Sequence, residues 1–189
     1  MRTITLLIIH CSAVRPDRQS SAADIDRWHR ERGWKKIGYH YVVRRDGTIE
    51  QGRPEEEVGA HCKNHNKHSI GICYEGGLDS RGRPADTRTP EQKAALWALL
   101  TELHRDYPHA IIVGHHDLDA RKACPCIGNV VQEYREIIPS RFSRILTSMA
   151  TLTGCGTTSP RSLSRMSVIP STSVLFLNVR QLPIRNVGK

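Results

Sequence analysis

Two histidines in this chain follow directly on apolar runs, and a cysteine stands a short distance beyond the second. His10 ends the run "LLIIH", His115 follows "IIVG", and Cys124 lies nine residues after His115, in "KACPC". Two imidazoles and one thiolate can hold zinc in a tetrahedral site, with the fourth position left for water. Zinc bound in this way lowers the pKa of that water to about 7 and polarises a carbonyl, so an open site of this kind is typical of catalysis.

The two histidines can meet only if the runs before them are neighbouring strands. Residues 3–9 are apolar or β-branched throughout, which is typical of a strand buried on both faces, and residues 110–114 predict a second buried strand. The ends of such strands lie at one sheet edge, where ligand sites of α/β domains are found. Spacing alone leaves two questions open. The histidines could be ordinary polar residues leaving the core, and either Cys124 or Cys126 could supply the thiolate.

The remaining patterns predict further strands and helices. Residues 21–33 open with a capping box and end in glycine, and residues 89–107 open with Thr and Pro, so both segments predict helices. The Asp46-Gly47 pair predicts a hairpin. The other predicted elements are a strand at 69–77 and a short helix at 129–138. Strands that alternate with helices indicate an α/β domain with a mixed central β-sheet flanked by helices.

Charge is distributed unevenly along the chain. The net charge is +9, but residues 139–189 hold seven Lys or Arg and no acidic residue. Residues 1–138 hold the other 21 basic and all 19 acidic residues, a net charge of +2, so the high pI does not indicate a nucleic-acid binder. We expect a single domain at 1–138 and a basic, Ser/Thr-rich, mostly disordered tail at 139–189, with one short strand at 173–179.

The sequence also bears on where the protein works. No apolar run approaches the roughly 20 residues that span a bilayer. The start, "MRTITLLIIHCSAVRPDR", lacks the longer apolar core and the small-residue cleavage site of a signal peptide. We therefore expect synthesis in the cytoplasm without a signal peptide, and reduced cysteines with one thiolate on a metal.

Four segments together resemble a known family. They are "IIHCSA", "GYHYVVRRDGTIEQGR", "GAHCKNHNKHSIGICYEGG" and "GHHDLDARKACP". Their order and spacing are similar to those of the zinc amidases of the type-2 N-acetylmuramoyl-L-alanine amidase family, whose superfamily includes T7 lysozyme and the peptidoglycan recognition proteins. The resemblance covers nearly all of residues 1–138. It implies zinc-dependent hydrolysis of the amide bond between N-acetylmuramic acid and L-alanine in bacterial peptidoglycan.

The resemblance also selects among the candidate ligands. It makes His10, His115 and Cys124 the ligands of Zn2+, whereas His116 occupies a position that the family varies. Cys124 precedes a proline, as the family's ligand does, and Cys126 falls outside the pattern.

Four further residues take functional positions by the same resemblance. Tyr39 and Lys122 match the active-site tyrosine and lysine. A phenol near zinc can orient the water or the tetrahedral intermediate and help to move a proton, and an ammonium can offset the oxyanion. His61 and Asn66 match a loop that lines the substrate groove, so we expect them to bind substrate.

The resemblance admits more than one function. A non-catalytic peptidoglycan-binding module is one alternative, but recognition proteins of that kind lack the cysteine ligand, and Cys124 is present. We expect a monomeric phage or prophage endolysin that acts on the cell wall after release, with a muropeptide substrate and no nucleic-acid partner. A cytoplasmic wall-recycling amidase is the other alternative.

Overall fold

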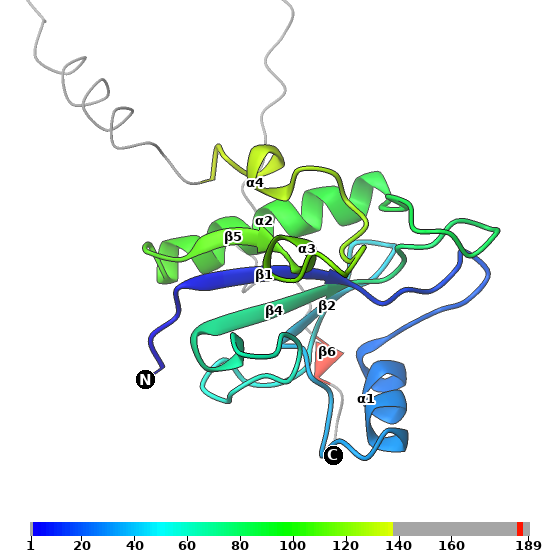
Figure 1. Cartoon of the computed structure of the whole chain (residues 1–189), viewed down its shortest axis with the longest axis horizontal. Coiled ribbons are helices and arrows are strands. Elements are labelled where there is room, and N and C mark those ends of the chain that lie inside the picture. The colour runs from blue at the N-terminus through cyan, green and yellow to red at the C-terminus, as the bar shows by residue number, and fades with distance from the viewer. Residues whose placement is uncertain (1, 138–184, 187–189) are drawn as a thin grey trace, which may run out of the picture. The chain divides into compact units, whose positions relative to one another are not determined.

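A computed structural model describes residues 2–137 and 185–186 of the chain. Its centre is one sheet in the strand order β5-β1-β4-β2-β3-β6 (Figure 1). In chain order the strands are β1 (Leu6–Cys11), β2 (Tyr41–Val43), β3 (Ile49–Gln51), β4 (Ser69–Tyr74), β5 (Ile111–Gly114) and β6 (Arg185–Asn186). β2 and β3 pair antiparallel at the predicted hairpin, and the other neighbouring strands pair parallel. The predicted mixed sheet is confirmed.

Helices and one 3₁₀ turn connect the strands. They are α1 (Ala22–Glu31), the turn η1 (Asn66–His68), α2 (Pro90–Asp106), α3 (His115–Leu118) and α4 (Val130–Glu133). Both predicted caps are present, because Ser21 Oγ accepts from the Asp24 backbone N–H and Thr89 Oγ1 from that of Gln92, each at 3.1 Å. Each long helix therefore begins where its cap predicts.

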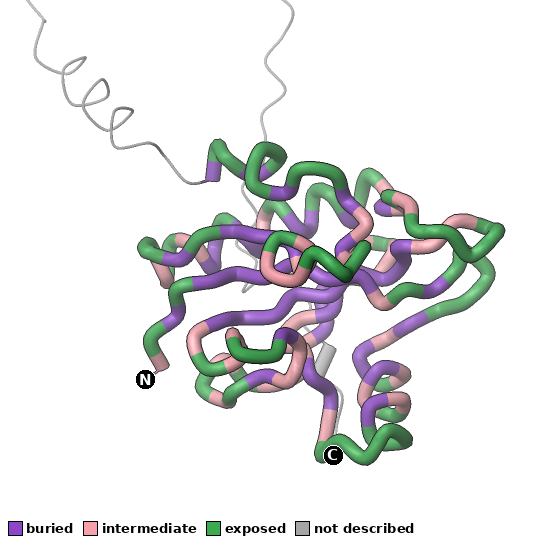
Figure 2. The backbone as a smooth tube through the Cα atoms, viewed as in Figure 1, coloured by how far each residue is buried: buried purple, intermediate pink, exposed green. Residues whose placement is uncertain are grey.

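The two long helices cover different parts of the sheet. Alternate residues of β1, Leu7 and Ile9, pack with Leu96 and Leu100 of α2 in the main core. α1 contributes Ile25 to a separate apolar cluster beside β2 and β4. Figure 2 shows the buried residues concentrated along the central strands. β1 is buried along its whole length, as its uninterrupted apolar sequence predicts.

Substitutions on the two faces of α2 test which face packs against the sheet. Leu96 is completely buried, so Leu96→Ala should lower the free energy of unfolding by about 2–5 kcal/mol through lost contacts and the cavity left behind. Lys93→Ala, on the exposed side of the same helix, should change it by less than about 0.5 kcal/mol. Urea unfolding followed by circular dichroism measures both. Equal losses in the two variants would contradict this orientation.

Some elements differ from the sequence predictions. α3 occupies a segment without a helical period, and at its start Asp117 Oδ2 accepts from the Gly114 backbone N–H at 2.7 Å. α4 is shorter than the helix predicted at 129–138. β6 was not predicted, and the rest of the predicted tail, including the strand expected at 173–179, lies outside the described residues. Among the described helices, none is long and apolar enough to cross a membrane.

Candidate metal centre

The sheet brings the two strand-end histidines together. β1 and β5 are parallel neighbours, with Ile9 opposite Gly114. His10, the next residue of β1, and His115, the first residue of α3 after β5 ends, therefore lie side by side, with ring centroids 4.6 Å apart. Cys124 arrives from the loop after α3, and its Sγ accepts from the Cys11 backbone N–H at 3.3 Å. The ligand atoms of His10, His115 and Cys124 all lie within 4.8 Å of one another.

The separation of these atoms suits zinc. With Zn–N bonds near 2.0 Å and a Zn–S bond near 2.3 Å, tetrahedral geometry puts the nitrogen and sulfur about 3.5 Å apart. His10 Nδ1 and Cys124 Sγ are 3.7 Å apart. The donor set of two imidazoles and one thiolate is also one that catalytic zinc sites use. The residues therefore fit the metal that the resemblance implies.

The electrostatic surroundings keep both imidazoles neutral. His10 is 1% exposed, and burial, with the neighbouring imidazoles of His61 and His115, holds its pKa well below the usual value. Burial also lowers the pKa of His115, helped by the positive charge of Lys122. Both rings therefore carry a free lone pair at neutral pH, as metal ligands must.

Tyr39 and Lys122 stand near the three ligand residues. The Tyr39 ring centroid lies 5.1 Å from that of His10. Burial raises the pKa of the Tyr39 phenol well above its usual value, so the hydroxyl stays protonated and can donate a hydrogen bond. Lys122 is exposed in the loop that leads to Cys124, and its charge acts on His115. Their roles in the reaction stay predictions.

His61 and Asn66 use their polar atoms inside the protein. His61 Nδ1 lies 3.0 Å from His10 Nε2. Asn66 Oδ1 accepts from the backbone N–H groups of His61 and Cys62, at 2.9 Å each. Asn66 therefore shapes the loop that carries His61. The expectation that these two residues bind substrate stays a prediction.

Sequence analysis missed two contacts at this site. Ser69 Oγ lies 3.3 Å from His61 Nε2, and no pattern marks a serine at the start of a strand as special. Cys11, directly after a ligand, lies with its Sγ 3.7 Å from Cys126 Sγ. Cys126 thus contacts Cys11 and is not among the three clustered ligand residues.

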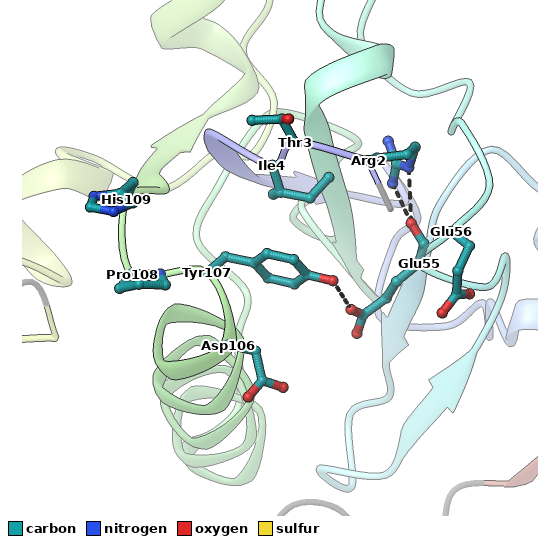
Figure 3. A pocket seen from close by; sticks show the side chains of 9 residues that line it. All are labelled: Arg2, Thr3, Ile4, Glu55, Glu56, Asp106, Tyr107, Pro108 and His109. Atoms are coloured by element: carbon teal, nitrogen blue, oxygen red, sulfur yellow. Dashed lines mark hydrogen bonds between the residues drawn. The ribbon is translucent and has the colours of Figure 1, made fainter.

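A pocket of about 550 Å³ lies at the other end of β1 (Figure 3). It is lined by Arg2, Thr3, Ile4, Glu55, Glu56, Asp106, Tyr107, Pro108 and His109. Tyr107 Oη donates to Glu55 Oε2 at 2.6 Å, and the Arg2 guanidinium donates to the Glu55 backbone carbonyl at 2.6 and 2.9 Å. Ile4 and His10 are six residue steps apart along extended chain, which corresponds to about 20 Å. The pocket is therefore separate from the metal centre.

Comparison with known proteins places the chain among peptidoglycan amidases and phage endolysins. The family model described as N-acetylmuramoyl-L-alanine amidase matches residues 1–127. The endolysin of Enterobacteria phage K11 is 46% identical over 117 residues, which cover 62% of this chain and 77% of that protein. The endolysin of Escherichia phage T7 is 43% identical over 119 residues, covering 63% and 78%. The family match takes in all seven predicted site residues.

Comparison with solved structures also finds similarity to N-acetylmuramoyl-L-alanine amidases. The N-acetylmuramoyl-L-alanine amidase LysC from Clostridium intestinale aligns with a TM-score of 0.58 at 30% identity, over 79% of this chain and 87% of that chain.

Proposed function

Since the chain belongs to the N-acetylmuramoyl-L-alanine amidase family, we propose that it cleaves peptidoglycan with a zinc ion held by His10, His115 and Cys124. The bond cleaved is the amide between N-acetylmuramic acid and L-alanine. The observation that supports this most strongly is the convergence of two neutral imidazoles and a thiol within 4.8 Å, from segments far apart in the sequence. When bound, zinc polarises the scissile carbonyl and makes water a stronger nucleophile.

Lys122, Tyr39 and Asn66 act at different points of the reaction and of the site. As water adds to the amide carbon, the carbonyl oxygen becomes negatively charged, and the Lys122 ammonium offsets that charge. The C–N bond then breaks, and the proton given up by the attacking water passes to the departing nitrogen of L-alanine. The Tyr39 hydroxyl, which stays protonated, orients the reacting groups and assists this proton transfer. Asn66 holds the loop at the edge of the substrate groove.

The relatives support a biological role as well. Two phage proteins with more than 40% identity to this chain are endolysins. We therefore assign this chain the role of a phage or prophage endolysin that acts on the cell wall.

Metal content and product analysis test this function together. Purified protein should contain about one zinc per chain, and chelation should abolish activity until zinc is returned. Digestion of purified peptidoglycan should release new L-alanine amino groups without new reducing sugar ends, because only the amide bond is cut. Full activity in metal-free protein would contradict the zinc assignment. New reducing ends would identify a glycosidase instead.

A further inference from the structure

A line of hydrogen bonds runs from His10 through His61 to a backbone carbonyl. His10 Nε2 lies 3.0 Å from His61 Nδ1, and His61 Nε2 lies 3.3 Å from Ser69 Oγ. Ser69 Oγ in turn donates to the His65 carbonyl oxygen at 2.8 Å. Ser69 is completely buried, so water does not compete for its hydroxyl. The line therefore begins at a metal ligand and ends at a group that can only accept.

That carbonyl sets the direction of every bond in the line. The one hydroxyl hydrogen of Ser69 goes to the carbonyl, so Ser69 Oγ accepts from His61 Nε2–H. A neutral His61 protonated at Nε2 has a bare Nδ1, which accepts from His10 Nε2–H. A neutral His10 protonated at Nε2 has a bare Nδ1, and that atom lies 3.7 Å from Cys124 Sγ.

The fold holds the His61 ring in place for this bond. A Cβ atom on Gly71 would lie 2.5 Å from Cγ and Cδ2 of His61, and one on Gly59 would lie 2.6 Å from Cδ2. Both distances are far below van der Waals contact, so the ring occupies space that only glycine leaves open at these positions. The backbone at His61 is also held, because its N–H donates to Asn66 Oδ1 at 2.9 Å.

We propose that His61 is a positioning residue for the metal ligand His10. By accepting the Nε2–H of His10, it keeps that ring in the tautomer and orientation whose Nδ1 can bind the metal. Both ring nitrogens of His61 are engaged in this line, so the residue acts through His10 and not as a contact to substrate. This role replaces the substrate-binding role predicted from the resemblance, and it rests on the proposed zinc site.

Three substitutions distinguish two effects of the His61 side chain: the hydrogen bond that its Nδ1 accepts and the space that its ring fills. In His61→Asn the amide oxygen can stand near the former Nδ1 position, whereas His61→Leu fills space without an acceptor. His68→Leu is the matched control, because His68 lies on the same loop, outside the line. Zinc affinity is measured by competition with a chromophoric chelator. We expect His61→Leu to weaken zinc binding about 10–100-fold, His61→Asn to restore most of that loss, and His68→Leu to match the unchanged protein.

One further variant, Ser69→Ala, tests the inference if His61→Leu does not fold. Ser69→Ala removes the acceptor for His61 Nε2–H and lets His61 take either tautomer. Zinc binding should then weaken about fivefold, the value of one hydrogen bond. Cobalt in place of zinc provides a spectroscopic readout, since a rotated His10 ring changes the visible absorption of the metal.

The outcomes distinguish the competing explanations. Unchanged zinc affinity in His61→Leu and Ser69→Ala, with a lower melting temperature of the metal-free protein, would show a purely structural role. Unchanged affinity with a raised KM would show that His61 binds substrate. Either result overturns the inference and leaves the proposed function standing. If the unsubstituted protein itself binds no zinc, the proposed function fails first.

Discussion

Cys124→Ser should remove the zinc and lower the rate of amide hydrolysis by on the order of a thousandfold or more, because the metal supplies several kcal/mol of transition-state stabilisation. The thiolate is one of only three protein ligands in the proposed site, and a serine hydroxyl does not ionise at neutral pH to replace it. His10→Ala should have the same effect, since it removes a buried ligand at the end of β1. Zinc content and hydrolysis rate are measured on each purified variant.

Cys126 provides the matched control for this experiment. Its Sγ lies beside that of Cys11, and it is outside the ligand cluster. Cys126→Ser should therefore keep both zinc and activity. The reverse pattern, with zinc lost from Cys126→Ser and kept in Cys124→Ser, would mean that the loop presents the other thiol to the metal.

Tyr39→Phe and Lys122→Ala should each lower kcat about a hundredfold or more while zinc stays bound. Neither side chain belongs to the ligand cluster, so their loss affects the reaction and not the metal. The phenol assists proton transfer, and the ammonium offsets charge on the carbonyl oxygen. The measurement is single-turnover hydrolysis of a soluble muropeptide, with zinc content determined on the same samples.

A second tyrosine and a second lysine serve as controls. The phenol of Tyr41 donates to Glu55, and Lys67 is exposed in η1. Tyr41→Phe and Lys67→Ala should leave kcat nearly unchanged. A near-normal kcat in both Tyr39→Phe and Lys122→Ala would mean that the metal and water carry the reaction by themselves.

The elements that carry the ligands could be predicted because they depend on local sequence. The apolar runs before His10 and His115 predict two buried strands, and parallel pairing then brings their ends together. Pattern alone did not separate Cys124 from Cys126. That choice depended on the family resemblance, since the position of each thiol depends on how the loop packs against β1.

Other features depend on contacts between distant segments and leave no local signal. Each bond in the line from His10 through His61 to Ser69 is a product of tertiary packing. β6 is only two residues long, and it is a strand because Arg185 and Asn186 pair with β3. α3 is a helix of one turn, and a hydrogen bond from the Gly114 backbone N–H to Asp117 Oδ2 lies at its start. None of these has a period that sequence analysis can detect.

The position of β1 between β4 and β5 has a consequence for folding during translation. Leu6 pairs with Ser69 of β4 on one side and with Ile111 of β5 on the other. At roughly 5–20 residues per second, β5 leaves the ribosome about 5–20 s after β1. Throughout that interval at least the β5-facing edge of this apolar segment has no partner, which makes the segment a site for aggregation or for chaperone binding. Cys124 emerges later still, so a growing chain cannot assemble the metal centre until its sheet is nearly complete.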